Sequence, residues 1–164
     1  MYRYALIALV GALSAVGAAK AVVSLDEARH APVAAAARSA PKAAVAQIVK
    51  ANDGHYWAEG VVNGKAVRFL VDTGATAVSL TADDARRLGL EPQTLDYDYD
   101  VITAQGKARA AAVRLASVSV AGAEIEGVDA LVIEKGLETS LLGMSYLGRL
   151  SRFEATRTAL ILRP

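Results

Sequence analysis

One short segment constrains this chain more than any other: an apolar strand that ends in an acid. Residues 69–71 are Phe-Leu-Val, and they lead directly into Asp72, Thr73, Gly74 and Ala75. β-Branched and aromatic residues favour a strand, and the small residues that follow favour a turn that leaves the Asp72 oxygens approachable. The segment therefore predicts a single carboxylate at the mouth of a β core, although an Asp that merely opens a turn has the same local sequence.

Two further segments have complementary properties. Residues 141–143 are Leu-Leu-Gly, ahead of a short helical segment at residues 144–150. Glycine at the end of this strand would let two backbones approach closely. Earlier in the chain, residues 101–109 form two strand-like arms joined by a turn that contains Gly106.

In this order, the three segments resemble those of the retropepsin-like (retroviral-type) aspartic proteases. The resemblance extends over about residues 56–162, and residues 142–154 resemble specifically a bacterial, single-domain, membrane-associated or periplasmic branch. It implies a mostly β fold, a closed barrel of antiparallel strands with one or two short helices and one lobe per chain. It also implies the site residues: catalytic Asp72, its loop partners Thr73, Gly74 and Ala75, a flap with Thr103, Ala104, Gln105 and Gly106 at its tip, and the second motif Leu141, Leu142 and Gly143.

The implied activity is that of an aspartic endopeptidase. Peptide hydrolysis by this route needs one ionised carboxyl group to activate water and one protonated group to donate to the carbonyl. Asp72 cannot do both, so two Asp72 side chains about 3 Å apart in a homodimer would share one proton. The resemblance also implies that the Thr73 hydroxyl forms a hydrogen bond to the backbone of the partner chain. The alternative is a non-catalytic peptide-binding or dimerisation module of the cell envelope on the same fold.

Composition narrows the remaining chemistry. The chain has 164 residues, a net charge of +1 and no cysteine. A polypeptide is therefore the expected partner and nucleic acid is not, because no strongly basic surface is available. With His30 and His55 as the only histidines, we expect neither a metal site nor a cofactor, and no Ser–His catalysis.

The N-terminal segment predicts export. An apolar run at residues 5–19 is preceded by Arg3 and followed by Lys20. The run is shorter than the roughly 20 residues that span a bilayer and ends in small residues, as a cleavable signal peptide does. The apolar pattern resumes after Lys20, so residues 4–23 would also serve as an uncleaved inner-membrane anchor, which the family resemblance favours. Either reading of residues 1–23 places the rest of the chain in the periplasm or another extracytoplasmic space.

The remaining organisation follows from local composition. Residues 24–51 are rich in alanine and contain Pro32 and Pro41, which predicts a flexible linker. Residues 52–164 should then form the protease domain. Within it we expect a hairpin of residues 56–62 and 65–71 around Asn63-Gly64, a strand at 77–80, a helix between Thr81 and Gly89, strands at 109–120, 123–128 and 130–133, the outer face of a strand at Asp96, Asp98 and Asp100, and a groove lined by Val71, Ala75, Val101, Ile102, Leu131 and Val132.

Overall fold

The hairpin expected around Asn63 and Gly64 begins the barrel. In the computed structural model, which describes residues 46–164, strands β2 (Trp57–Val62) and β3 (Lys65–Val71) pair antiparallel. Asn63 and Gly64 take positive φ values of 48° and 81°, as a tight two-residue hairpin turn requires. This turn fixes the register of β3 and therefore the position at which Asp72 leaves the sheet.

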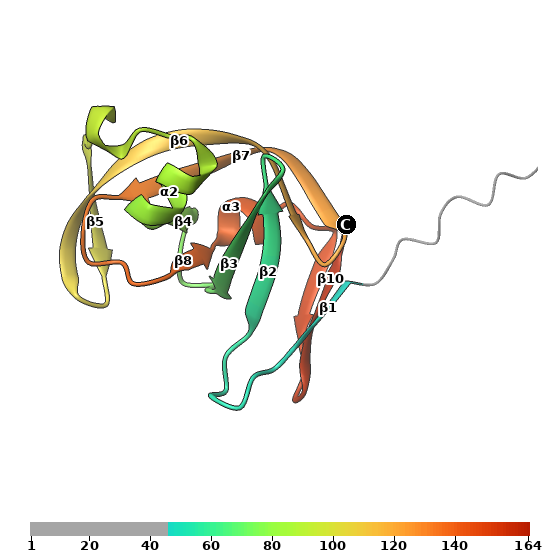
Figure 1. Cartoon of the computed structure of the whole chain (residues 1–164). Coiled ribbons are helices and arrows are strands. Elements are labelled where there is room, and N and C mark those ends of the chain that lie inside the picture. The colour runs from blue at the N-terminus through green and yellow to red at the C-terminus, as the bar shows by residue number, and fades with distance from the viewer. Residues whose placement is uncertain (1–45) are drawn as a thin grey trace, which may run out of the picture. The chain divides into compact units, whose positions relative to one another are not determined.

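Seven strands form the main sheet, in the order β2-β3-β8-β4-β7-β6-β5, and a pairing between β2 and β6 closes it (Figure 1). The strands not yet given bounds are β4 (Val78–Leu80), β5 (Tyr99–Thr103), β6 (Gly106–Val120), β7 (Ala123–Ile133) and β8 (Ser140–Leu142). The mostly β closed barrel is confirmed. It is not antiparallel throughout, because β8 runs parallel to β3 and β4 runs parallel to β7. These partners are distant in the sequence, and alternation within a strand carries no information on its direction.

The longest hairpin joins β6 and β7. Ala121 and Gly122 form its turn with φ values of 50° and 88°, at the place expected from the sequence. β7 runs without a break from residue 123 to 133, so the two strands expected there are one. β5 begins only at Tyr99, so Asp96 and Asp98 precede the strand and the alternating acidic pattern is not its outer face.

Helix α2 (Ala82–Leu88) confirms the helix predicted between Thr81 and Gly89. The Thr81 hydroxyl accepts a hydrogen bond from the backbone N–H of Asp84 at 3.0 Å, and Gly89 ends the helix with a φ of 91°. A 3-10 turn, η1 (Pro92–Thr94), follows, and α3 (Met144–Leu147) is the second short helix.

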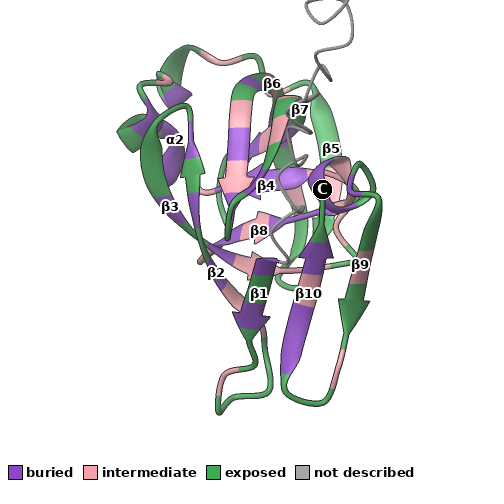
Figure 2. Cartoon of the chain, turned by 90° about the vertical axis from the view of Figure 1, so that its right-hand side faces the viewer, coloured by how far each residue is buried: buried purple, intermediate pink, exposed green. Residues whose placement is uncertain are grey.

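A three-stranded sheet lies beside the barrel, in the order β1-β10-β9 (Figure 2). It contains β1 (Ala46–Val49), β9 (Arg152–Ala155) and β10 (Ala159–Arg163). The predicted linker boundary is therefore wrong, because residues 46–49 pair antiparallel with β10 and bury Ala46 and Ile48. Four residues in an alanine-rich background give too weak an alternation to reveal this strand, and its partner lies at the other end of the chain.

The expected signal or anchor segment, residues 1–23, and the rest of the expected linker, residues 24–45, lie outside the described residues. Within residues 46–164, no helix has the length and apolar character needed to cross a membrane.

The barrel interior holds one continuous apolar core. Phe69 and Leu142 from neighbouring strands, and Tyr146 and Leu147 from α3, have no exposed surface. The Tyr146 hydroxyl is not left unpaired, since it donates a hydrogen bond to the Ala123 carbonyl at 2.7 Å. This core fixes β3 and β8, the two strands whose ends form the site described next.

Candidate active site

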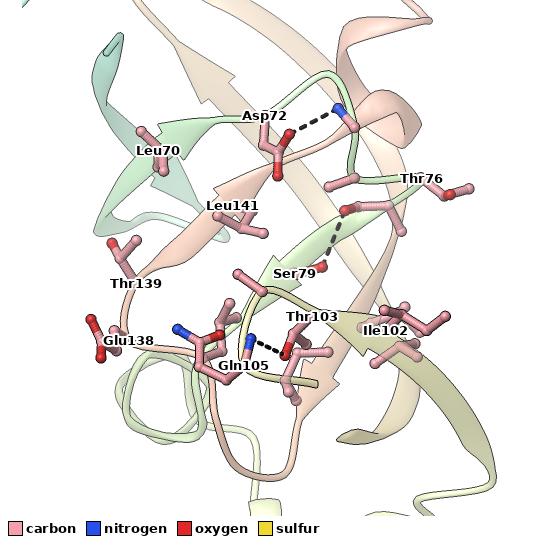
Figure 3. A pocket seen from close by; sticks show the side chains of 18 of the residues that line it. Leu70, Asp72, Thr76, Ser79, Ile102, Thr103, Gln105, Glu138, Thr139 and Leu141 are labelled. Atoms are coloured by element: carbon pink, nitrogen blue, oxygen red, sulfur yellow. Dashed lines mark hydrogen bonds between the residues drawn. The ribbon is translucent and has the colours of Figure 1, made fainter. Parts of the chain in front are cut away.

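Asp72 leaves the end of β3 in a turn held by backbone contacts. Its N–H donates to the Leu142 carbonyl at 3.2 Å, and its own carbonyl accepts from the Ala75 N–H at 3.3 Å. One carboxylate oxygen accepts the Gly74 N–H at 2.8 Å. Figure 3 shows the other oxygen turned toward the cavity below the loop. The carboxylate is half-buried, oriented and still accessible.

Gly143 brings β8 against this turn. A Cβ atom at this position would lie 2.2 Å from the Ala77 carbonyl oxygen and 2.7 Å from that of Ala75, so only glycine fits. The next residue, Met144, donates its N–H to the Ala75 carbonyl at 2.8 Å. The structure thus places the Leu-Leu-Gly strand directly beside the Asp-Thr-Gly loop.

A cavity of about 730 Å³ opens below Asp72. Its wall is mainly apolar, with polar groups at intervals and two acidic side chains, Asp72 and Glu138. Figure 3 shows Glu138 at the end of the cavity away from Asp72. The lining residues are Trp57, Leu70, Asp72, Gly74, Ala75, Thr76, Ala77, Ser79, Val101, Ile102, Thr103, Ala104, Gln105, Leu131, Ile133, Leu137, Glu138, Thr139 and Leu141.

The hairpin of β5 and β6 forms one side of this cavity. Thr103 and Gly106 pair across its tip, where the Thr103 hydroxyl donates to the Gly106 carbonyl at 3.0 Å and accepts the Gln105 N–H at 3.3 Å. Gly106 has a φ of 115° and no atom near its missing side chain. Ile102 beside the tip is 87% exposed. The hairpin thus presents three of the four expected flap residues to the cavity, and its role as a flap stays a prediction.

The expected site residues meet the cavity unevenly. The structure brings Asp72, Gly74, Ala75 and Leu141 to its wall, while Thr73 is exposed and Leu142 is buried in the core. Of the expected groove residues, Ala75, Val101, Ile102 and Leu131 line it. Val71 and Val132 do not, because they fall on the opposite side of their strands.

Several lining residues were not predicted from the sequence, notably Trp57, Ser79, Glu138 and Thr139. Thr139 could have been found, because it lies two residues before Leu141 and so faces the same side of the extended chain. Ser79 could not, because only the tertiary pairing of β4 with β8 sets it opposite Leu141. Within the described residues, no group of three or more His, Asp or Glu side chains is arranged to hold a metal ion.

Comparison with known proteins decides the family. Residues 58–149 match the family model described as "gag-polyprotein putative aspartyl protease". A crystal structure of a retropepsin-like aspartic protease from Rickettsia conorii matches with a TM-score of 0.65 and 38% identity, covering 71% of this chain and 96% of that one. The chain belongs to the retropepsin-like aspartic proteases. Asp72, the β5–β6 hairpin and the Leu-Leu-Gly strand of this retropepsin-like chain all lie inside the matched residues.

Two curated relatives of the retropepsin-like chain are bacterial. This chain is 40% identical over 112 residues to an uncharacterised protein in the cobV 5′ region of a Sinorhizobium species, and the match covers 68% of this chain and 48% of the relative. It is 39% identical over 115 residues to an uncharacterised protein of Rickettsia prowazekii (strain Madrid E), covering 70% and 49%. The chain therefore spans about half the length of these relatives.

Proposed function

We propose that this protein is an aspartic endopeptidase in which two copies of the chain hydrolyse a peptide bond by water held between two Asp72 carboxylates. The observation that carries the proposal is the oriented Asp72 carboxylate, fixed by the Gly74 N–H and opening onto a cavity of about 730 Å³. Membership of the retropepsin-like aspartic proteases supports the reaction class.

The need for a second copy follows from the acid–base chemistry. Water is activated by one ionised carboxylate while a protonated carboxyl group donates toward the substrate carbonyl. Among residues 46–164, the only other acidic residue lining this cavity is Glu138, at its far end. A second Asp72 beside the first supplies the missing acid, and the pair holds one proton because two adjacent carboxylates resist full ionisation.

The expected substrate is an extended polypeptide with apolar side chains near the cut bond. Leu70, Leu131 and Leu141 line the cavity, and the exposed Ile102 lies at its edge. These side chains favour burial of apolar substrate groups, and the β5–β6 hairpin would cover the bound segment.

The location of the enzyme is a second part of the proposal. The apolar run within residues 1–23 supports export of the following domain to an extracytoplasmic space, either after cleavage of a signal peptide or from an inner-membrane anchor. Fractionation of cells expressing the full chain, followed by N-terminal sequencing, distinguishes the two forms.

Replacing Asp72 tests the activity directly. We expect Asp72→Asn to lower kcat/KM for peptide cleavage by several orders of magnitude, because an amide keeps the shape of the carboxyl group but cannot exchange its proton. The thermal transition should change little. Glu138→Gln is the matched control, since it changes the other acidic residue of the same cavity.

Two results would count against the proposal. Retention of more than about a tenth of the activity by Asp72→Asn would mean that less than about 1.4 kcal/mol of barrier lowering depends on this carboxylate. A wild-type protein that binds peptides tightly and never cleaves them would instead favour a non-catalytic peptide-binding module of the envelope.

A further inference from the structure

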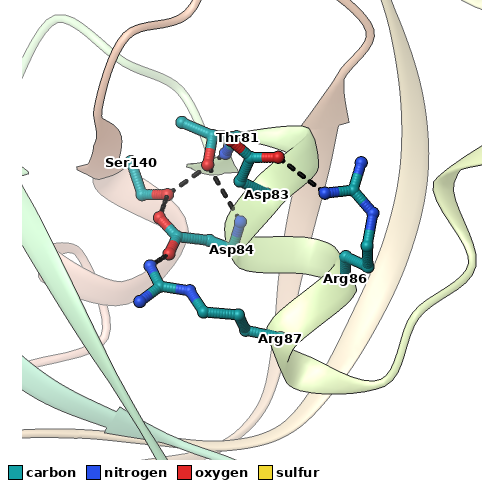
Figure 4. Close-up of polar contacts among 6 residues, drawn as sticks. All are labelled: Thr81, Asp83, Asp84, Arg86, Arg87 and Ser140. Carbon is teal, nitrogen blue, oxygen red and sulfur yellow. Dashed lines mark hydrogen bonds and ion pairs between the residues drawn. The ribbon is translucent and has the colours of Figure 1, made fainter.

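A buried polar ring lies behind the cavity wall, outside the catalytic machinery. Asp84 of α2 is 5% exposed and Ser140 of β8 is fully buried. The Ser140 hydroxyl donates to an Asp84 carboxylate oxygen at 2.5 Å and accepts the Thr81 N–H at 3.1 Å. The Asp84 N–H returns to the Thr81 hydroxyl at 3.0 Å, which closes the ring (Figure 4).

The Asp84 carboxylate determines which groups donate and which accept the hydrogen bonds of this ring. A hydroxyl group has one proton, and because Asp84 is an acceptor, the Ser140 proton must point toward it. The lone pairs of the Ser140 oxygen are then left for the Thr81 N–H. Arg87 pairs with the other oxygen of Asp84 from the solvent side, so the buried charge is balanced (Figure 4).

The ring links the two strands that form one side of the cavity. Ser140 lies between Thr139 and Leu141, which both line the cavity, and Thr81 directly follows β4, whose Ser79 lines it too. Ser79 and Leu141 are the only residues of β4 and β8 in direct register.

A single pair of residues in register holds β4 and β8 together only weakly. Side-chain hydroxyl groups add hydrogen bonds at both ends of β4. At the start of β4, the Val78 N–H donates to the Ser145 hydroxyl at 2.9 Å. At its end, the Thr81 N–H donates to Ser140. The spacing between Ser79 and Leu141 therefore depends on these hydroxyls as well as on the short ladder.

We propose that Asp84 and Ser140 are positioning residues that set the shape of the cavity wall formed by Ser79 and the Thr139–Leu141 edge, and thereby select substrates by side-chain size. They do not touch substrate. Asp72 is held at the other end of β8 by the Leu142 carbonyl, and by the Gly74 N–H, so the chemical step should depend on the ring less than substrate binding does.

The kinetic test rests on the proposed peptidase function. Ser140→Ala and Asp84→Asn are compared with wild type on two peptides that differ only in a large or small apolar side chain next to the cut bond. We expect KM for the favoured peptide to rise and the ratio of kcat/KM values between the peptides to fall by about five-fold or more, with kcat changed by less than about two-fold. The double variant should be no worse than the more affected single variant, because both changes act on the same hydrogen bond between Ser140 and Asp84.

Asp83→Asn is the matched control. Asp83 is the neighbouring acid on α2; it is exposed, and its carboxylate pairs with Arg86 at 2.6 Å on the same helix. Its substitution should leave both KM and the size preference at wild-type values. A Ser140→Ala protein with lower thermal stability but unchanged KM and size preference would overturn the proposal, since the ring would then be structural only. Additive losses in the double variant would overturn it as well.

A binding measurement separates this proposal from the proposed function. Trp57 is the one tryptophan of the chain and lines the cavity, so its fluorescence reports binding of a non-cleavable hydroxyethylene peptide. Ser140→Ala should weaken this binding by about five-fold or more and Asp83→Asn should not, whether or not the wild type cleaves peptides. Equal affinity in wild type and Ser140→Ala would reject the positioning role, while absence of cleavage with these affinity differences intact would reject only the peptidase function.

Discussion

The buried residue Tyr146 makes the stability of the core depend on pH. Its ring has no exposed surface, and its hydroxyl donates to the Ala123 carbonyl at 2.7 Å. Burial raises the pKa of Tyr146 from an ordinary value of 10.0 to about 12, because the phenolate would lose its hydration. The folded state therefore holds this proton over a pH range in which the unfolded chain has released it.

This shift predicts a loss of stability in alkali. Below pH 10 both states carry the proton and the free energy of unfolding is unaffected; between about pH 10 and 12 only the unfolded state releases it, so stability falls as pH rises. We expect a loss of about 2 to 3 kcal/mol across this window from Tyr146 alone. Urea denaturation between pH 8 and 12 measures it.

Tyr146→Phe is the control for this titration. The variant loses the bond to Ala123 and should be less stable at pH 8 by about 1 kcal/mol. Its stability should fall less steeply above pH 10 than that of the wild type. Parallel curves for the two proteins would show that another group causes the alkaline loss.

Among the elements, the β5–β6 hairpin combines an exposed apolar side chain with a turn that glycine adopts without strain and other residues do not. Ile102 is 87% exposed, and Gly106 holds a φ of 115° with open space where a side chain would be. A residue with a Cβ atom at this position would meet backbone strain and no steric clash. The hairpin is therefore sensitive to substitution in its shape more than in its packing.

Gly106→Val tests whether this hairpin is the flap. We expect local strain of about 1 to 3 kcal/mol, a displaced tip and a reduced kcat/KM, with a modest fall in the thermal transition and the dimer largely preserved. The assay is peptide cleavage together with thermal unfolding. Gly122→Val is the matched control, because Gly122 also has positive φ and open surroundings but lies in the β6–β7 turn. Normal kinetics in Gly106→Val would show that the flap lies elsewhere.

At the scale of the whole molecule, the site of one chain is incomplete for the proposed reaction. Each chain contributes one Asp72, and the neighbouring Thr73 and Gly74 are exposed at the end of the barrel. A symmetric dimer would cover these residues and bring the two carboxyl groups together.

We therefore expect the activity per chain to fall on dilution, in parallel with the dimer fraction. Sedimentation velocity over a concentration series, combined with peptide cleavage at the same concentrations, measures both quantities. Thr73→Ala should move both curves to higher concentration, because the resemblance assigns the Thr73 hydroxyl to the partner's backbone. A monomer whose activity per chain is independent of concentration would exclude the shared site.

Local sequence patterns determined several of the turns and helix ends of this protein. The Asn63-Gly64 and Ala121-Gly122 turns, the Thr81 and Gly89 caps, and the adjacency of the Asp72 loop and the Leu-Leu-Gly strand were all predictable. Each depends on residues close together in the chain, or on a family resemblance that preserves their order.

The pairing of segments that are distant in the sequence is set by tertiary packing. This packing set β8 parallel to β3, joined β1 to β10, placed Ser79 opposite Leu141, and buried Asp84 against Ser140. A strand's own sequence specifies which of its faces is apolar, but not its neighbour, its direction or the register between them. Those choices come from packing a common core, and they determine which side chains line the cavity and which support it from behind.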